Sequence, residues 1–409
     1  MSTEWKRKKF LDFPIEEYRQ RLNKFRKYMQ EEGIDGAVIT QKESAIYFTG
    51  FCTDLWDSKY WTQGMGVVIS MDHEPIVFTT TIDMGPALTL CWVDDKNIRE
   101  WSPAGKARGF EFDTGEGLIL SIIKELGLEK KTIGFEMGLA VRMTMPYNQF
   151  QRILAALPNA KIKDASTAIM KTREIKSDAE VERIRTACHI TSLGIDAVWK
   201  ALDDRWRSGI TQIELEKAFS GAVVDAGGKM EFFSAWTGPP YMDLSNGYAQ
   251  PIKAKRGDIV NLDIGARYKG YVSDFMRIAF VGGEPKKEWA DMLKVLREAQ
   301  TATIELLKPG ARGEDLEKVC TDIIKKAGYW EDYIYAGHGI GTEVHELPRI
   351  NDVVFKKGMV LTVEPAIFPA RRLKGAPDAP GFWVEENIVI TEDGYEILSN
   401  YDPEPYIVL

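Results

Sequence analysis

The sequence contains little of what marks secreted or membrane-spanning proteins. Its 409 residues include four cysteines, at positions 52, 91, 188 and 320, and none of them forms a Cys-x-x-Cys pair. Scattered thiols in a long chain are typical of reduced core residues, which argues against a disulfide scaffold and favours a reducing compartment. No apolar run approaches the ~18 residues of a membrane span, and no apolar segment follows the basic N-terminus. We therefore expect a cytoplasmic protein without a signal peptide.

The charge balance gives no indication of nucleic-acid binding. The net charge is −8, whereas a protein that binds nucleic acid mainly through phosphate contacts carries a basic surface. With 44% hydrophobic and 28% charged residues, the composition is that of an ordinary soluble protein. A small peptide or another small molecule is the expected partner, with no nucleic acid and no membrane.

The first part of the chain alternates helical and strand-like patterns. Residues 15–32 carry apolar side chains at three- and four-residue spacing, as in an amphipathic helix, and Gly33 follows them. Short apolar runs at 36–40, 66–70, 75–79 and 132–136 are typical of strands, and 147–156 of a helix. This alternation predicts an α/β domain over residues 1–168.

An aromatic loop interrupts this domain at residues 47–61 and includes Trp56, Tyr60 and Trp61. Such aromatics are typical of core or domain-interface packing. The alternative is that they form a wall of a binding site, in this subunit or in a partner subunit.

The pattern changes after a predicted capping box at Ser177–Glu180. Two long helices (178–203 and 211–227) precede a strand-rich block at 230–282. Two further helices (286–307 and 313–327) precede a second strand-rich block from 330 onward. We expect an α+β domain over residues 169–409, with an architecture suggestive of duplication.

A β-hairpin at residues 261–274 is the first candidate site. If its turn is centred between Tyr268 and Lys269, Asp263 lies directly opposite Asp274. Two adjacent carboxylates repel each other unless a cation lies between them. Taken alone, the pair is also typical of a solvated sheet face.

Three more candidate ligands lie about a hundred residues downstream. His338 stands in a glycine-rich segment, Glu364 on an alternating strand, and Glu385 near the start of another strand. Each alone is typical of a turn or of a solvated strand position. Together with Asp263 and Asp274 they provide one nitrogen and four carboxylate ligands, which suits two divalent ions of Mn, Co, Fe or Zn. Two such ions can hold a hydroxide between them as a nucleophile.

These residues and their surroundings resemble the pita-bread metallopeptidase family, M24. The motifs are Asp263-x10-Asp274, Gly-His338-Gly-Ile-Gly-Thr-Glu-Val-His345-Glu, Gly-Met-Val-Leu-Thr-Val-Glu364-Pro and Val-Glu385-Glu. The two-domain layout resembles the prolidase, aminopeptidase P and creatinase branch over nearly the whole chain. The resemblance implies a creatinase-like α/β N-terminal domain and a pita-bread α+β catalytic domain.

The resemblance also implies roles for the motif residues. Asp263 would chelate one metal, Asp274 and Glu385 would bridge two, and His338 and Glu364 would complete the set. Glu364 would shuttle a proton and His345 would steady the oxyanion. A homodimer is implied as well, in which the N-terminal domain helps to enclose the partner's site.

Three positions depart from the family pattern. Asn246 and Ile334 stand where the family has histidines, and Trp383 replaces an arginine that helps to organise the Xaa-Pro binding site. An indole offers an apolar, cation-accepting face in place of a bidentate carboxylate clamp. The predicted substrate contacts are therefore Trp383, Asn246, Trp56, Tyr60 and Trp61.

Three hypotheses follow. The leading one is a dinuclear-metal hydrolase resembling Xaa-Pro dipeptidases and aminopeptidases. The alternative is a non-peptidase pita-bread enzyme, a C–N hydrolase or a lyase similar to the one that cleaves dimethylsulfoniopropionate, acting on a small, cationic metabolite. The third is a non-catalytic interaction module. Family members of that kind lose metal ligands, whereas this chain keeps all five.

Overall fold

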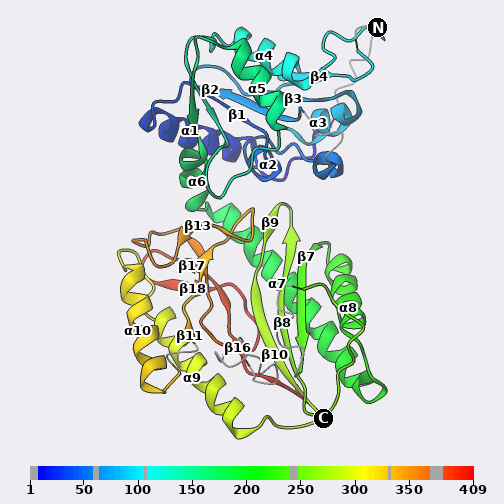
Figure 1. Cartoon of the computed structure of the whole chain (residues 1–409), viewed down its shortest axis with the longest axis vertical. Coiled ribbons are helices and arrows are strands. Elements are labelled where there is room, and N and C mark those ends of the chain that lie inside the picture. The colour runs from blue at the N-terminus through cyan, green and yellow to red at the C-terminus, as the bar shows by residue number, and fades with distance from the viewer. Residues whose placement is uncertain (1–7, 59–63, 106–107, 239–246, 330–332, 369–380) are drawn as a thin grey trace. The chain divides into compact units, whose positions relative to one another are not determined.

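The computed structural model describes residues 8–58, 64–105, 108–238, 247–329, 333–368 and 381–409 (Figure 1). The chain divides into two compact units, Met1–Arg173 and Glu174–Leu409. The division lies five residues beyond the predicted boundary at 168/169. The hydroxyl of Tyr47 donates a hydrogen bond to Thr172 O at 3.2 Å, which ties the segment after residue 168 to the first unit. No helix among the described residues is long and apolar enough to cross a membrane.

The N-terminal unit is built on a mixed six-stranded sheet with the strand order β4-β3-β2-β1-β5-β6. The strands are β1 (Gly36–Ile39), β2 (Gly66–Ser70), β3 (Ile76–Thr80), β4 (Ile98–Trp101), β5 (Thr132–Phe135) and β6 (Lys161–Asp164). The helices are α1 (Ile15–Glu31), α2 (Lys42–Thr49), α3 (Met84–Leu90), α4 (Gly115–Glu125), α5 (Tyr147–Ala156) and α6 (Ser166–Glu174).

Helix α1 forms where the apolar spacing predicted it. Tyr18, Leu22, Phe25 and Met29 are all buried, because residues three and four apart share one face of a helix. Gly33 ends the helix with a φ of 65°, a left-handed conformation that glycine adopts without steric cost.

The C-terminal unit repeats a helix-helix-strand arrangement, as the sequence predicted. Its first half contains α7 (Asp178–Arg205), α8 (Gln212–Asp225), β7 (Lys229–Thr237), β8 (Ile259–Tyr268), β9 (Tyr271–Val272) and β10 (Phe275–Val281). Its second half begins with α9 (Lys287–Ile304) and α10 (Gly313–Lys326). The remaining strands are β11 (Tyr333–Ile334), β12 (His338–Gly339), β13 (Glu346–Arg349), β14 (Val360–Val363), β15 (Ala366–Ile367), β16 (Phe382–Trp383), β17 (Glu386–Ile390), β18 (Tyr395–Ile397) and β19 (Tyr406–Val408).

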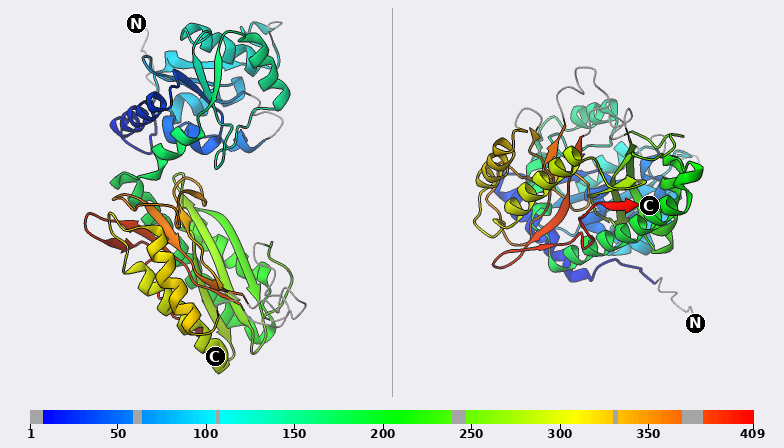
Figure 2. Two further views of the ribbon diagram at one scale, coloured as in Figure 1. Left: turned by 60° about the vertical axis from the view of Figure 1, so that its left-hand side comes forward. Right: turned by 90° about the horizontal axis from the view of Figure 1, so that it is seen from below.

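The strands of this unit lie between its two pairs of helices, with α7 and α8 on one side and α9 and α10 on the other (Figures 1 and 2). They form three sheets, ordered β19-β10-β8-β7, β11-β15-β16 and β13-β12-β14-β17-β18. The predicted capping box at the start of α7 is present, since Ser177 and Glu180 exchange hydrogen bonds with each other's backbone. This arrangement brings strand-borne side chains from both halves to one place.

The hairpin between β8 and β10 has a different register from the predicted one. Tyr268 pairs with Tyr271, so the turn consists of Lys269 and Gly270, with φ values of 47° and 87°. Positive φ at both turn residues is the type I′ geometry, which matches the twist of the flanking strands. Asp263 therefore pairs with Met276, and the same register sets Asp274 across from Gly265, two residues along from Asp263. A two-residue shift keeps both carboxyls on one face.

Candidate metal centre

The two hairpin acids meet although they are not direct cross-strand partners. Asp263 lies within β8, and Asp274 immediately precedes β10. Diagonal neighbours on one sheet face remain within reach of each other. Their carboxyl groups are close enough that each influences the acidity of the other.

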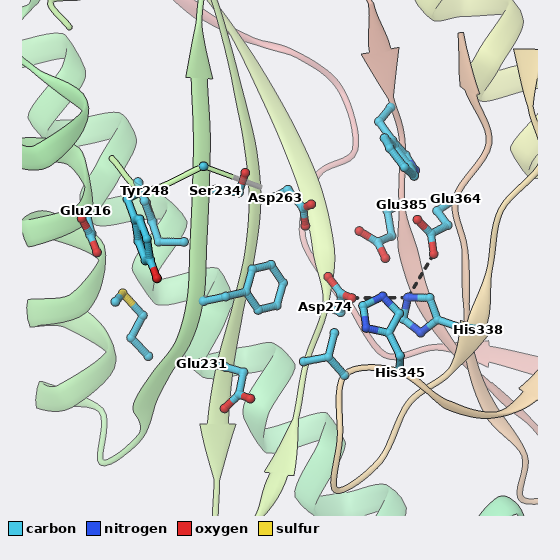
Figure 3. Close-up of a pocket in the computed structure, with 16 residues that line it drawn as sticks. Glu216, Glu231, Ser234, Tyr248, Asp263, Asp274, His338, His345, Glu364 and Glu385 are labelled. Carbon is cyan, nitrogen blue, oxygen red and sulfur yellow. Dashed lines mark ion pairs between the residues drawn. The ribbon is translucent and has the colours of Figure 1, made fainter. Parts of the chain in front are cut away.

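The second half of the unit brings three side chains to the same place. His338 lies in β12, Glu364 directly follows β14, and Glu385 lies between β16 and β17. His338 Nε2 is 3.1 Å from Glu364 Oε1 and 3.6 Å from Asp274 Oδ2. Ligand atoms of Asp274, His338 and Glu385 all lie within 4.8 Å of one another. Figure 3 shows these side chains pointing toward one another from separate strands.

The carboxyl groups of this cluster have strongly perturbed acidities. Burial, followed by the negative charge of Glu364, raises the pKa of Asp263 to about 7. Burial and the neighbouring carboxylates raise the pKa values of Asp274 and Glu385 well above their ordinary range. Buried like charges resist full ionisation unless a cation compensates them. The cluster is therefore a place of excess negative charge.

The pKa values of His338 and His345 shift in opposite directions in these surroundings. Burial lowers the pKa of His338, but its hydrogen bond to Glu364 and the charge of that carboxylate more than offset burial, so the net shift is upward. Burial and the nearby His338 lower the pKa of His345. The two rings are 4.1 Å apart between centroids.

The donor set fits divalent cations. Asp274 Oδ1 and Glu385 Oε1 are buried and have no hydrogen-bond partner among the described residues. Buried polar atoms are nearly always paired, so two orphaned carboxylate oxygens in one cluster point to a missing electrophilic partner. Carboxylate oxygens with one imidazole nitrogen suit borderline-hard divalent ions. These residues can thus hold a divalent metal.

A hydroxyl links the histidine and one of the glutamates. Thr362 Oγ1 accepts a hydrogen bond from the backbone N–H of His338 at 3.0 Å and donates one to Glu364 Oε1 at 2.9 Å. Thr362 and Glu364 share one face of their strand because side chains two residues apart point the same way. Neighbours of this kind orient metal ligands.

Asn387, in β17, fixes the backbone of Asp274 through hydrogen bonds. It is fully buried, accepts a hydrogen bond from the backbone N–H of Asp274 at 3.0 Å, and donates one from Nδ2 to Asp274 O. The next residue, Glu386, has a structural role, because its carboxylate forms an ion pair with the buried Arg277 at 3.0 Å. Of these two adjacent glutamates, Glu385 thus belongs to the cluster and Glu386 to a structural ion pair.

The cluster lies at one end of a cavity of about 650 Å³. Besides the five predicted ligands and His345, its walls are mostly apolar or acidic: Glu216, Met230, Glu231, Phe232, Phe233, Ser234, Gly247, Tyr248, Val344 and Trp383. Figure 3 shows Glu216 and Tyr248 on the side away from the cluster. Arg267 neutralises Glu231 through two hydrogen bonds of 2.6 and 2.7 Å. The cavity is large enough for a small ligand.

The predicted substrate contacts have different outcomes. Trp383 lines the cavity, and its ring meets Phe368 edge to face at 5.6 Å. Asn246, Tyr60 and Trp61 lie outside the described residues. Trp56 is 3% exposed, packs against Phe51 and donates its indole N–H to Thr40 O at 3.1 Å. So little free surface favours the core-packing alternative for Trp56 over the ligand-binding one.

Several residues of the site were absent from the sequence prediction. Thr362 and Asn387 each stand two residues from a predicted ligand, so the two-residue periodicity of strands was a usable signal for both. Glu216 and Tyr248 had no such signal, because each enters the cavity from an element whose position depends on the tertiary fold.

Comparisons with known proteins agree with this geometry. Residues 182–392 match the model of metallopeptidase family M24, and residues 21–175 match that of the creatinase/prolidase N-terminal domain. The Xaa-Pro dipeptidase of Pyrococcus furiosus is 28% identical over 392 residues, covering 94% of this chain and 99% of its own. That of Lactobacillus helveticus is 27% identical, covering 95% and 98%.

Solved structures show the same relationship. The Xaa-Pro dipeptidase from Bacillus anthracis has a TM-score of 0.78 and 26% identity, covering 95% of this chain and 99% of its own. The predicted α/β creatinase-like and α+β pita-bread domains are confirmed, as is the prediction of a metallohydrolase. The buried acid and histidine cluster occupies the domain that the M24 model matches. This chain belongs to metallopeptidase family M24, in the branch with a creatinase/prolidase N-terminal domain.

Proposed function

We propose that this chain is a cytoplasmic, homodimeric Xaa-Pro peptidase that uses two divalent metal ions to cleave small peptides. The observation that carries the proposal is the convergence of Asp263, Asp274, His338, Glu364 and Glu385 at one end of a cavity, with two buried carboxylate oxygens left unpaired among the described residues. The Xaa-Pro dipeptidase relatives support this activity over a non-peptidase reaction.

The five cluster residues would hold the metals. Asp263, Asp274, Glu364 and Glu385 would each supply carboxylate oxygens, and His338 would supply an imidazole nitrogen. Bound divalent ions would supply Lewis acidity for the scissile carbonyl and lower the pKa of water toward neutrality. Mn, Co, Fe and Zn are all compatible with such oxygen and nitrogen ligands.

The chain's own residues would handle proton and charge movements. Glu364 would take the proton of the attacking water and deliver it to the departing proline nitrogen. Its Oε1 is held by the Thr362 hydroxyl, so its orientation is set before substrate arrives. His345 has a lowered pKa and lines the cavity, so its neutral ring would donate an N–H bond to the developing oxyanion.

Metal analysis combined with a panel of Xaa-Pro dipeptides, Xaa-Pro amides and longer Xaa-Pro peptides tests the proposal. We expect two metal equivalents per chain and hydrolysis of at least one member. Two bound metals with no cleavage of any member would overturn the peptidase assignment and favour the non-peptidase alternative. No tight metal binding, and no activity after addition of Mn²⁺ or Co²⁺, would favour the interaction module.

The proposed homodimer concerns the aromatic loop. In a dimer, Tyr60 and Trp61 would contact substrate in the partner's site, which would explain aromatic side chains in a loop with few periodic cues. Sedimentation equilibrium measures the assembly directly. A dimer is expected, and a monomer would remove the argument for contacts in trans.

A further inference from the structure

The segment that enters the C-terminal unit pairs with the chain just before β14, the strand that leads to Glu364. Ile175 forms a β-bridge with Met359, and the backbone N–H of Lys176 donates to Gly358 O at 2.7 Å. Gly358 and Met359 immediately precede β14, whose end carries Glu364. Lys176 is therefore fixed at its backbone beside a strand that supports a predicted ligand.

The side chain of Lys176 forms a buried ion pair with Glu346. Nζ lies 2.8 Å from Glu346 Oε1, and both side chains are only 1% exposed. Removing two charges from water is costly, and a buried pair compensates for this only when its geometry is good. Packed apolar side chains often stabilise such a position equally well, so the pair invites a second explanation besides stability.

The pair fills the inside of the loop between β12 and β13. A Cβ atom added to Gly341 would clash with Glu346 Oε1 and lie 2.9 Å from Lys176 Cε, so a side chain at Gly341 would have to displace the ion pair. Glu346 pairs with Gly339 across the two strands, and Gly341 O accepts a hydrogen bond from Val272 N at 2.9 Å. The loop is wrapped around the ion pair and tied to the Asp263–Asp274 hairpin.

This loop carries His345, the residue directly before Glu346. The His345 ring lies against that of His338 and lines the cavity, whereas Lys176 and Glu346 are not among the cavity-lining residues that the structure describes. We propose that Lys176 and Glu346 are positioning residues, and that their ion pair holds the His345 ring at the reacting end of the cavity. The role of His345 in catalysis rests on the proposed function, whereas the link between Lys176 and the His345 ring does not.

Two single variants and one double variant test the proposal in the metal-loaded enzyme. Lys176→Met and Glu346→Gln are each expected to lower kcat by up to about 100-fold, the cost of a small misplacement of a catalytic group, with KM and metal content unchanged. In Lys176→Met/Glu346→Leu, two apolar groups replace the pair. Relative to the two single variants, this double variant is expected to regain thermal stability while its kcat stays low. Recovery of both together would show a purely structural role and overturn the proposal.

A double-mutant cycle asks whether Lys176 acts through His345. In a His345→Ala background, Lys176→Met is expected to lower kcat by less than about twofold, because coupled residues have non-additive effects. If Lys176→Met lowered kcat by the same factor with His345→Ala as without it, the result would contradict the proposal. Leu316→Ala, a fully buried position in α10, is the stability control and should lose stability without losing kcat.

A readout independent of activity separates this inference from the proposed function. The chain has four histidines, so their ring resonances in the zinc-loaded protein are few enough to assign by single substitutions. Lys176→Met is expected to shift the His345 resonances while those of His73 and His189 stay in place. Unchanged His345 resonances would refute the positioning role. A shift without peptide cleavage by the wild type would refute the proposed function alone.

Discussion

Both units of this chain bury acidic side chains, but they compensate them in different ways. In the N-terminal unit, Glu136 Oε2 accepts hydrogen bonds from the backbone N–H groups of Thr40 and Gln41, at 2.7 and 2.9 Å, and from the Thr40 hydroxyl at 3.2 Å. In the C-terminal unit, Asp274 and Glu385 instead converge with other buried acids on the imidazole of His338. A buried carboxylate with several donors is a structural element, whereas converging carboxylates with few donors form a cation site.

The largest effect is expected from Asp274→Ala, which removes a carboxylate predicted to bridge the two metal ions. Metal content and peptide hydrolysis should fall to background while the circular dichroism spectrum is unchanged, because neutralising a repulsive cluster does not remove core packing. Elemental analysis after gel filtration measures the metal. Asp291→Ala, at an exposed ion pair with Lys287, is the control and should retain it. Unchanged metal content in Asp274→Ala would refute the bridging assignment.

The second largest effect is expected from the ionisation of Glu136, which should change the free energy of unfolding rather than the activity. Burial raises its pKa from 4.5 to about 7, with partial opposition from the Thr40 and Gln41 hydrogen bonds. The folded state then retains a proton that the unfolded state releases, so stability falls as pH rises from 4.5 through 7. At ~1.4 kcal/mol per pKa unit, the loss is about 3 kcal/mol.

The Glu136→Gln variant tests this assignment because it cannot ionise. Hydrogen exchange of β1 and β5 amides at pH 5 and pH 8 should show a pH-dependent loss of protection in the wild type and a smaller one in the variant. Glu125→Gln, at an exposed ion pair with Arg99, is the control and should resemble the wild type. Equal pH dependence in all three proteins would show that Glu136 is not the responsible group.

Thr362→Val should produce an intermediate effect confined to the metal centre. The variant keeps the shape of the side chain but loses the hydroxyl between His338 N and Glu364 Oε1. Loss of such supporting contacts lowers metal affinity or activity by about 10- to 100-fold. Competition with a metal chelator measures the affinity.

The control for Thr362→Val is Thr303→Val, which removes another buried hydroxyl, one that donates to Ala299 O within α9 at 2.7 Å. It should lose stability without losing metal affinity. Equal affinity losses in both variants would mean that general destabilisation, and not ligand orientation, accounts for the result.

The smallest effect is expected from Trp383→Arg, which introduces the cation that the resemblance to the family predicts at this position. A partly exposed pair between this arginine and a free carboxylate contributes about 0.4–1 kcal/mol, so KM for an Xaa-Pro dipeptide should fall about two- to fivefold. KM for the corresponding amide should not change. Trp383→Phe tests whether the aromatic ring matters by itself, and an equal change for dipeptide and amide would argue against a carboxylate contact.

The sequence predicted those parts of the molecule that depend on local pattern. The paired helices, the capping box at Ser177 and the five candidate ligands follow from periodicity, capping chemistry and motif. The hairpin turn was misplaced because Lys269, a non-glycine residue, adopts positive φ beside Gly270. The error did not change the predicted site, because a shift of two residues preserves the face.

The remaining features depend on contacts between residues far apart in the sequence. Lys176 and Glu346 are separated by 170 residues and meet only because β14 and the loop after β12 fold together. The Asn387 contact to Asp274 has the same origin. The burial of Trp56 also depends on the tertiary fold, because an aromatic loop has no internal sign of the side on which the core lies. Local patterns contain no information about such pairings.

The separation of the ligands along the chain has a consequence for folding. Asp263 and Glu385 are 122 residues apart and belong to opposite halves of the C-terminal unit. Neither half contains a complete ligand set, so metal should bind tightly only after the halves have docked. The binding free energy then stabilises the junction between the halves rather than either half alone. Metal uptake would thus report that folding is complete, and chelation would loosen that junction first.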